Sequence, residues 1–247
     1  VGGLIMLFIG AEGLIRGSSN LAIKIGITPL VVGLTVVAFG TSTPELVVSL
    51  KAALLGNSSI SLGNVVGSNI ANIALILGVA ALIKPLDVHA KVIMREIPIM
   101  IGISLLLLLL LLDGELGFID GLVFVSGIIT YTFVNVWMAR KEKSPEVDKE
   151  FKDGLKSKLG IPVSIVLMIA GLGLLILGAN LFVQSAVAIA KMFNVSDAII
   201  GLTIVAIGTS LPELITSIVA AYKKESDIAI GNVVGSNIFN ILGILGI

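Results

Sequence analysis

The chain carries one short segment twice, as Gly40-Thr-Ser-Thr-Pro-Glu-Leu46 and as Gly208-Thr-Ser-Leu-Pro-Glu-Leu214. A second segment follows each copy at the same distance. Residues 63–73 read Gly-Asn-Val-Val-Gly-Ser-Asn-Ile-Ala-Asn-Ile, and residues 231–241 differ from them only by Phe in place of Ala. A shift of 168 residues aligns residues 10–79 with residues 178–247 without a gap. This agreement indicates an internal duplication, which constrains the fold more than any other feature of the sequence.

The duplicated segments lie in a strongly apolar chain. Of its 247 residues, 56% are hydrophobic and 13% are charged, whereas about a quarter of the residues in a soluble domain are charged. A bilayer core needs about 20 apolar residues per helix. Eight stretches meet this length, near residues 1–25, 27–55, 61–84, 92–112, 117–139, 160–190, 196–222 and 227–247. The predicted fold class is therefore an all-α membrane protein with eight transmembrane helices in this chain.

The two copies are predicted to be inverted relative to each other. Five expected spans separate equivalent points of the copies, and an odd number of crossings reverses the direction of the chain. Inverted repeats are typical of secondary transporters. We divide the chain into a first half (1–139) with five helices, a linker (140–159) and a second half (160–247) with three. The second half would need roughly sixty more residues to match the first, so we expect ten helices in the complete protein.

Polar side chains line one face of the second expected span and recur in the seventh. Positions three or four apart share a face of a helix. The second span carries Thr35, Ala38, Ser42, Glu45 and Ser49, and the seventh carries Thr203, Ala206, Ser210, Glu213 and Ser217. The third and eighth spans add Asn64, Ser68 and Asn72, and Asn232, Ser236 and Asn240. Four helices are thus predicted to present oxygen-bearing side chains within apolar segments.

The Gly-Thr-Ser-x-Pro-Glu segment predicts a break in its helix. Gly weakens a helix, and Pro removes a hydrogen bond but suits the first turn of a restarted helix behind a Ser or Thr cap. We expect the break between Gly40 and Pro44. Such a break frees carbonyl groups for cations, and a membrane tolerates it only where the backbone is buried or lines a cavity.

Glu45 and Glu213 are the residues around which we expect the functional site. A carboxylate at the centre of a bilayer costs about 2.5–3.5 kcal/mol on insertion scales, and neither span holds a Lys or Arg near enough to compensate it. Two carboxylates among hydroxyl and amide oxygens suit a hard cation, and Ca²⁺ with six to eight oxygen ligands is the best match. The alternative is that both carboxyl groups are protonated and only pack the helices together.

Composition excludes several other classes of protein. The 16 basic and 16 acidic residues cancel, so no overall field attracts nucleic acid. The chain has no Cys and a single His, His89, and it lacks a His-Glu-x-x-His zinc motif or a Ser-His pairing. We therefore expect a transporter, not an enzyme, with no cofactor. The lipid bilayer is the expected surrounding, and the sequence indicates no protein partner.

Four further groups of residues have a structural interpretation that we favour. The pairs Gly63/Gly67 and Gly231/Gly235 are predicted to pack helices closely through small residues. Glu12 and Arg16 are spaced as an ion pair on one helix. His89 is expected at the surface, with a pH sensor as the alternative. An external cluster is expected to be a solvated turn, with a cation-attracting mouth as the alternative; it comprises Asp113, Glu115 and Asp120.

At its duplicated motifs the chain resembles the cation/calcium antiporter superfamily, specifically the sodium/calcium exchanger branch and its prokaryotic members. The resemblance runs through both repeats. It implies ten helices in two inverted sets of five and exchange of Ca²⁺ for Na⁺ by alternating access. Carried over by motif position, it implies cation ligands at Glu45, Glu213, Thr41, Ser42, Thr209, Ser210, Ser68, Ser236, Asn72 and Asn240, and at the carbonyl groups of Ala38 and Ala206.

Differences from the family pattern bear on which ion is exchanged for Ca²⁺ and on calcium-sensing domains. Asn240 stands where several relatives, including potassium-dependent exchangers, have Asp, so the resemblance argues against potassium coupling. The proton/calcium exchanger branch differs at the Pro-Glu segment, so Na⁺ is the favoured coupling ion and H⁺/Ca²⁺ exchange the alternative. A cation channel built from the same oxygens is a remote alternative. The linker at 140–159 is too short for the calcium-sensing domains of animal relatives.

The basic residues predict how the chain is oriented. Fourteen of the 16 fall on one side of the expected spans, and only Lys51 and Lys191 fall on the other. Because cytoplasmic loops are enriched in Lys and Arg, we expect a cytoplasmic linker and an external N-terminus. The resemblance to prokaryotic members makes the prokaryotic plasma membrane the expected location.

This orientation is tested by labelling. A cysteine introduced at Ser144 in this cysteine-free chain is expected to resist a membrane-impermeant reagent added outside intact cells, because the linker is cytoplasmic. It is expected to react once the cells are permeabilised. Labelling of intact cells would contradict the orientation.

Overall fold

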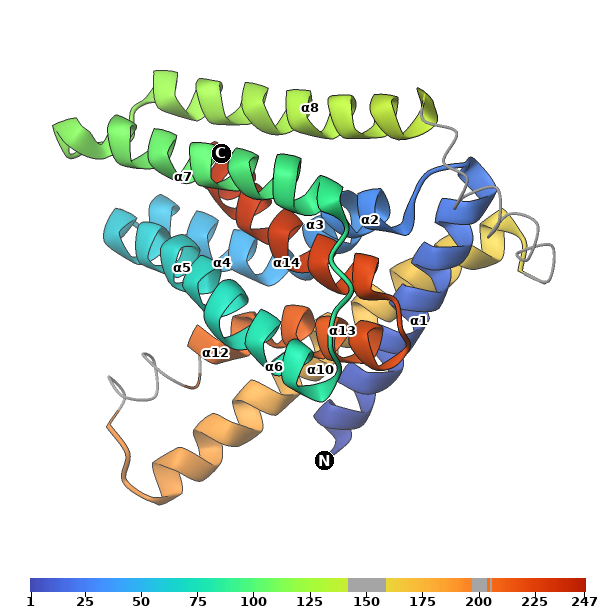
Figure 1. Cartoon of the computed structure of the whole chain (residues 1–247). Coiled ribbons are helices and arrows are strands. Elements are labelled where there is room, and N and C mark those ends of the chain that lie inside the picture. Colours follow the sequence, from blue (N-terminus) through green and yellow to red (C-terminus); the bar gives the residue numbers. More distant parts are fainter. Residues whose placement is uncertain (142–158, 197–203, 205) are drawn as a thin grey trace.

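The computed structural model describes residues 1–141, 159–196, 204 and 206–247 (Figure 1). Within these residues all regular structure is helical. In chain order the elements are α1 (Gly2–Ile25), α2 (Pro29–Val32), η1 (Gly33–Val37), α3 (Ala38–Thr41), α4 (Thr43–Leu54), α5 (Ser58–Ala71), η2 (Asn72–Ile76), α6 (Leu77–Ile83), η3 (Val92–Glu96), α7 (Ile97–Leu110), η4 (Leu111–Asp113), α8 (Phe118–Lys141), α10 (Ile161–Met192), α12 (Ala206–Thr209), α13 (Leu211–Tyr222), α14 (Ser226–Phe239) and η6 (Asn240–Ile244). Here η1, η2, η3 and η6 are π-helical turns and η4 is a 3₁₀ turn.

The membrane-spanning character follows from the length and hydropathy of these helices. Five described helices are long and apolar enough to cross a bilayer, and a sixth span results if the bent pair Pro29–Thr41 and Thr43–Leu54 is counted as one. They include Ser58–Ile83 and Ser226–Ile244. The all-helical membrane class is thus confirmed for the described chain, whereas the count of eight spans stays a prediction. The seventh expected span and the linker lie partly outside the described residues.

The helices surround α14, which lies at the centre of the molecule (Figure 1). In the span Ser226–Ile244, 89% of the most apolar stretch is buried. The helix packs against α2, η1, α3 and α13, while α7 and α8 lie together along one side (Figure 1). This central position explains why α14 carries Asn232, Ser236 and other polar side chains without exposing them.

The predicted break in the second span is confirmed. The chain leaves helical geometry at Ser42 (φ −80°, ψ 8°), and α4 restarts with Thr43 and Pro44 at an angle of 48° to the preceding helix. Ser210 has the same conformation (φ −87°, ψ 7°) between α12 and α13. Neither hydroxyl group caps the following helix, so both serine side chains are available for other contacts.

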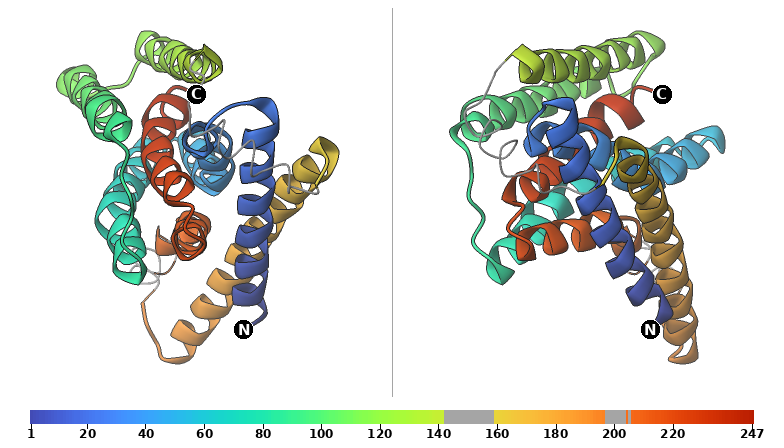
Figure 2. Two further views of the ribbon diagram at one scale, coloured as in Figure 1. Left: turned by 45° about the vertical axis from the view of Figure 1, so that its right-hand side comes forward. Right: turned by 90° about the vertical axis from the view of Figure 1, so that its right-hand side faces the viewer.

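Helices α1 and α10 lie side by side through small residues at seven-residue spacing (Figure 2). A Cβ atom added at Gly3 would lie 2.8 Å from the carbonyl oxygen of Gly178, and one added at Gly10 would lie 2.7 Å from that of Gly171. One added at Gly17 would lie 2.6 Å from the carbonyl oxygen of Ser164. These backbone contacts leave no room for a side chain, as is typical of closely packed membrane helices.

Close packing is confirmed for one of the two predicted glycine pairs of the repeat. A Cβ atom at Gly231 or Gly235 would lie 2.8 Å or 2.5 Å from the carbonyl oxygen of Leu30 or Leu34, which confirms close packing there. A Cβ atom at Gly63 or Gly67 would meet no described atom within 4 Å. These two glycines line a cavity, and their packing stays a prediction, because the equivalents of α2 and η1 in the second repeat, residues 197–203 and 205, lie outside the described residues.

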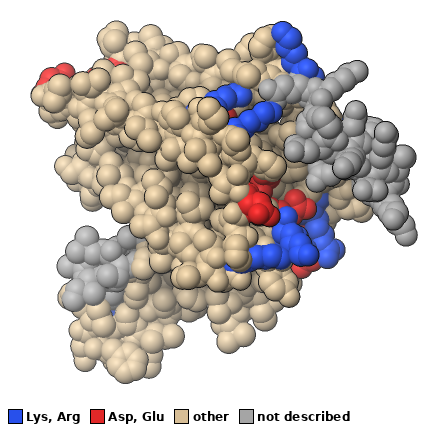
Figure 3. Space-filling model, in the orientation of Figure 1, with Lys and Arg blue, Asp and Glu red and all other residues tan. Residues whose placement is uncertain are grey.

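Charged residues are sparse on the surface and gather toward one side of the face drawn in Figure 3. The predicted pair of Glu12 and Arg16 is confirmed, and Lys223 at the end of α13 joins it with its Nζ 2.9 Å from Glu12 Oε1. The repeat places Asn180, Gln184 and Leu55 at the equivalent positions. This ion pair between α1 and α13 is therefore a feature of one side of the repeat only.

His89 lies at the surface and the acidic cluster before α8 forms a turn, as the sequence predicts. His89 is half-exposed, and its Nε2 lies 3.3 Å from Asp227 Oδ1. In the turn before α8, Asp113 Oδ1 accepts a hydrogen bond from the Glu115 amide and Asp120 Oδ2 accepts one from the Gly117 amide. These side chains stabilise a local turn.

Substitution within the α1–α10 contact tests the packing. Gly10→Ala is expected to lower the thermal unfolding midpoint in detergent, because overpacking typically costs about 1–3 kcal/mol. The matched control is Gly102→Ala on α7, where no described atom lies within 4 Å of the added Cβ and the change is expected to be neutral or stabilising. Equal midpoints for the two variants would contradict the packing described.

Candidate cation-binding site

The two repeats meet at a crossed pair of hydrogen bonds. Ser42 Oγ donates to Glu213 Oε1 at 2.9 Å, and Ser210 Oγ donates to Glu45 Oε1 at 3.0 Å. Each serine lies at the helix break three residues before the glutamate of its own repeat. Both glutamates are 1% exposed. The breaks therefore place each carboxylate against the serine of the opposite repeat.

Two asparagines hold the broken helices against the third and eighth spans. Asn64 Nδ2 donates to Ser49 Oγ (2.9 Å) and to the Glu45 carbonyl oxygen (3.2 Å). Asn232 Nδ2 makes the equivalent contacts with Ser217 Oγ (3.1 Å) and the Glu213 carbonyl oxygen (3.3 Å). These bonds connect α4 to α5 and α13 to α14. They set the position of each helix that carries a glutamate.

Several buried oxygen atoms at this crossing have no hydrogen-bond partner in the described structure. They are Glu45 Oε2, Glu213 Oε2, Asn72 Oδ1, Asn240 Oδ1 and Ser236 Oγ. Buried polar atoms almost always have a partner, because an unpaired one costs about 1–3 kcal/mol. Among the described residues, neither Glu45 nor Glu213 forms an ion pair. The arrangement therefore collects negative charge and oxygen acceptors that a cation would satisfy.

The remaining predicted ligands occupy varied environments. Thr41 is buried, and its Oγ1 donates to Asn232 Oδ1 at 2.9 Å. Ser68 is buried, with its Oγ 3.5 Å from Ser210 Oγ. Thr209 is half-buried and ends α12, which begins at Ala206.

The Ala38 carbonyl group, a ligand implied by the family resemblance, keeps one helical hydrogen bond and has a second lone pair to offer. The Ser42 amide donates to it at 3.0 Å, and Thr41 Oγ1 lies 3.4 Å away. The break is a change of direction at one residue, so the last bond of α3 survives. Pro44 lacks an N–H group and removes instead the donor that would face the Gly40 carbonyl.

A cavity of about 150 Å³ reaches the predicted ligands Ser68 and Ser210. Its other lining residues are mostly small or apolar and include Gly63, Gly67 and Ala71. The polar crossing is thus accessible along α5. At the equivalent positions on α14, Gly231 and Gly235 pack directly on the backbone of α2 and η1.

The helical spacing of the polar residues did not predict a role for Asn69 and Asn237. Each follows directly after a predicted ligand, Ser68 or Ser236. Asn69 contacts Asn240, and Asn237 contacts Asn72, in each case across the two repeats. Their identity in the two copies of the motif was the signal that could have found them.

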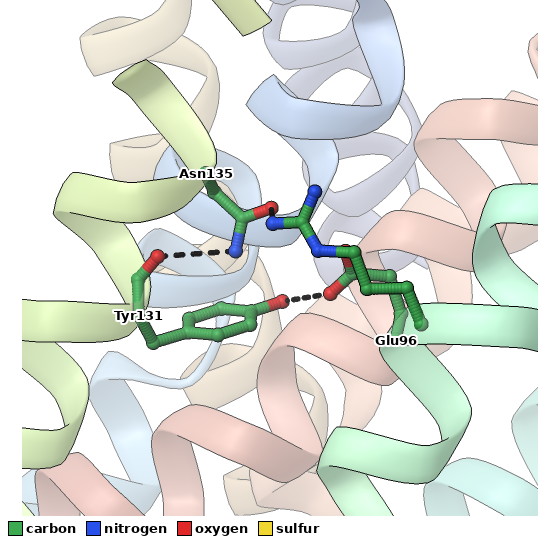
Figure 4. Close-up of polar contacts among 4 residues, drawn as sticks. Glu96, Tyr131 and Asn135 are labelled. Atoms are coloured by element: carbon green, nitrogen blue, oxygen red, sulfur yellow. Dashed lines mark hydrogen bonds and ion pairs between the residues drawn. The ribbon is translucent and has the colours of Figure 1, made fainter. Parts of the chain in front are cut away.

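A second buried polar cluster lies away from this crossing, between η3 and α8 (Figure 4). Tyr131 Oη donates to Glu96 Oε2 at 2.7 Å, Arg95 Nη2 donates to Asn135 Oδ1 at 2.8 Å, and Arg95 Nε lies 3.4 Å from Glu96 Oε1. Here the glutamate has an arginine beside it. The contrast shows how unusual the uncompensated Glu45 and Glu213 are.

Comparison with known proteins agrees with this geometry. Residues 1–137 and 163–247 match the family described as sodium/calcium exchanger protein. The chain belongs to the sodium/calcium exchanger family. It is therefore a transporter of the exchanger type and not an enzyme.

Individual relatives show the same relationship. The chain is 33% identical over 282 residues to the sodium/calcium exchanger MaX1 of Methanosarcina acetivorans, covering 99% of this chain and 80% of that protein. It is 39% identical over 248 residues to the inner membrane protein YrbG of Escherichia coli K12, covering 99% of this chain and 76% of the relative. A solved structure of the sodium-calcium exchanger NCX_Mj, soaked with Na⁺ and Sr²⁺, matches with a TM-score of 0.86 and 36% identity, over 99% of this chain and 78% of that one.

Proposed function

We propose that this member of the exchanger family moves Ca²⁺ against Na⁺ by alternating access at the crossing of the two repeats. The observation that carries the proposal is the set of buried oxygens without partners, contributed by both repeats and including one oxygen of Glu45 and one of Glu213. Ca²⁺ takes six to eight oxygen ligands. Among the described residues no group of three or more His, Cys, Asp or Glu side chains lies together, so hydroxyl, amide and carbonyl oxygens supply the rest.

The physical basis of exchange is competition for the two carboxylates. One Ca²⁺ or two to three Na⁺ neutralise the negative charge of Glu45 and Glu213. Binding both kinds of cation at once would place excess positive charge in the site. Occupation by one ion therefore expels the other. The ligands carried over from the family pattern belong to this proposal: Glu45, Glu213, Thr41, Ser42, Thr209, Ser210, Ser68, Ser236, Asn72, Asn240, Ala38 and Ala206.

A cavity on α5 supports access to the site from one side of the membrane. It is lined by Gly63 and Gly67 and reaches the proposed ligands Ser68 and Ser210. With the N-terminus outside, this end of α5 faces the exterior, so the cavity is the proposed route between the site and the external solution.

The α1–α10 pair is the proposed moving element. The two helices pack backbone to backbone at Gly3, Gly10 and Gly17. They are the first and sixth expected spans, and neither carries a proposed ligand. A rigid pair of this kind can slide past a fixed site without disturbing the ligands. Solved structures of NCX_Mj describe extracellular ion exchange and induced binding-site occlusion in that protein, and we propose that this chain also exchanges ions through changes in access to its site.

Substitution of either glutamate tests the proposal. Glu45→Gln or Glu213→Gln in reconstituted liposomes is expected to abolish Na⁺-gradient-driven Ca²⁺ uptake, because each removes one of two charges that offset the dehydration of Ca²⁺. The matched control is Glu115→Gln in the exposed turn before α8, which is expected to transport as the wild type does. The assays include a proton uncoupler, so that H⁺/Ca²⁺ exchange would appear as uptake lost with the uncoupler.

Near-normal uptake by either site variant would contradict the site. Unitary currents in place of saturable exchange stimulated from the opposite side would favour a channel.

Exchange by this protein is expected to need no potassium. Asn240 contributes an amide oxygen and no charge, so two carboxylates balance one Ca²⁺ without an additional K⁺. Wild-type Na⁺-driven Ca²⁺ flux is therefore expected to be the same with and without K⁺, and Asn240→Asp is expected to alter the monovalent-ion dependence more than Ca²⁺ recognition. A wild-type protein that is inactive until K⁺ is added would contradict this reading.

A further inference from the structure

Four asparagines form a hydrogen-bonded cluster where α5 and η2 cross α14 and η6. Asn72 Nδ2 donates to Asn237 Oδ1 at 2.9 Å, and Asn240 Nδ2 donates to Asn69 Oδ1 at 3.0 Å. The two bonds are equivalent under the internal repeat, because residues 69 and 72 correspond to residues 237 and 240. Asn72, Asn237 and Asn240 are each 1% exposed, and Asn69 is half-buried.

One bond to the backbone sets the direction of the Asn240 amide. Asn69 Nδ2 donates to the backbone carbonyl oxygen of Asn237 at 3.1 Å. A carbonyl oxygen can only accept, so the amino group of Asn69 must face it and the Oδ1 atom must face the other way. That Oδ1 in turn accepts from the amino group of Asn240. The Asn240 oxygen is therefore directed away from Asn69, where it is buried without a partner.

A parallel sequence of contacts sets the direction of the Asn72 amide. Asn237 Nδ2 lies 3.5 Å from the sulfur of Met100 on α7, and a thioether is a weak acceptor that cannot donate. The Asn237 oxygen consequently faces Asn72 and accepts from its amino group. The Asn72 oxygen is left buried and unpartnered, as the Asn240 oxygen is.

The direction of these two amides matters because each has a donor end and an acceptor end. With the oxygens free, Asn72 and Asn240 add acceptors to a site that already holds two carboxylates, and only a cation satisfies them all. With the amides reversed, the amino groups could donate to the glutamates and stabilise the site without an ion. The same residue would then weaken cation binding.

We propose that Asn69 and Asn237 are positioning residues that hold the amides of Asn240 and Asn72 with their oxygens available to the transported cation. The inference rests on the proposed function of the site. It assigns each positioning residue to the ligand of the opposite repeat, Asn237 to Asn72 and Asn69 to Asn240. Neither positioning residue contacts the cation.

The pairing gives a test that a purely structural role would not pass. An aspartate has an oxygen at both ends, so its orientation has no effect on the number of acceptors it offers. Asn237→Leu is expected to weaken Ca²⁺ binding about 10–100-fold, the usual effect of losing a residue that orients a metal ligand. In the Asn72→Asp background this loss is expected to disappear. In the Asn240→Asp background it is expected to persist, because Asn240 is held by Asn69.

The second set of variants tests the other pair, Asn69 and Asn240. Asn69→Leu is expected to weaken Ca²⁺ binding in the wild-type and Asn72→Asp backgrounds but not in the Asn240→Asp background. Asn69 is half-buried, so this arm is available where Asn237→Leu fails to fold. The measurement is the equilibrium affinity for Ca²⁺ of the purified chain in detergent by calorimetric titration, with thermal unfolding of every variant recorded in parallel.

The outcomes separate this inference from the proposed function. A wild-type chain without saturable Ca²⁺ binding would contradict the proposed function. A wild type that binds Ca²⁺, with both leucine variants binding equally well, would overturn the positioning role alone. A loss of equal size in all three backgrounds would also overturn it, because it would show that the asparagines only pack the helices.

Discussion

The structure depends on two carboxylates that are buried in an apolar molecule with no basic residue described beside them. The second polar cluster shows the ordinary solution, in which Glu96 lies beside Arg95 and accepts a hydrogen bond from Tyr131. Glu45 and Glu213 each receive one serine hydrogen bond and keep one oxygen without a partner. In the proposed function the transported cation supplies the missing partners, because carboxylates already satisfied by neighbouring side chains would bind an ion only weakly. The helix breaks, the buried asparagines and the central position of α14 all serve to maintain it.

The internal repeat explains how two copies of a short motif form one site. Each copy supplies a serine for the carboxylate of the other copy, and each supplies an asparagine for the amide of the other. Neither repeat forms these contacts alone. The two halves are not identical, because the Glu12–Lys223 ion pair has no counterpart in the other half.

The sequence predicted the polar stripes and the helix break because both arise from local rules. Helical periodicity placed Ser42 and Glu45 on one buried face, and Pro44 together with Gly40 marked the break. The sequence did not reveal Asn69 and Asn237, since their role depends on contacts with the opposite repeat.

The central claim is that the unpartnered oxygens of Glu45 and Glu213 bind the transported Ca²⁺. The most direct test is an anomalous difference map from crystals soaked with Ca²⁺ or Sr²⁺ at low Na⁺. The account predicts a peak between the two carboxylates, about 2.3–2.6 Å from their oxygens, that weakens as Na⁺ is raised. A map with strong peaks elsewhere, for example at the turn of Asp113 and Asp120, and none between Glu45 and Glu213 would contradict it.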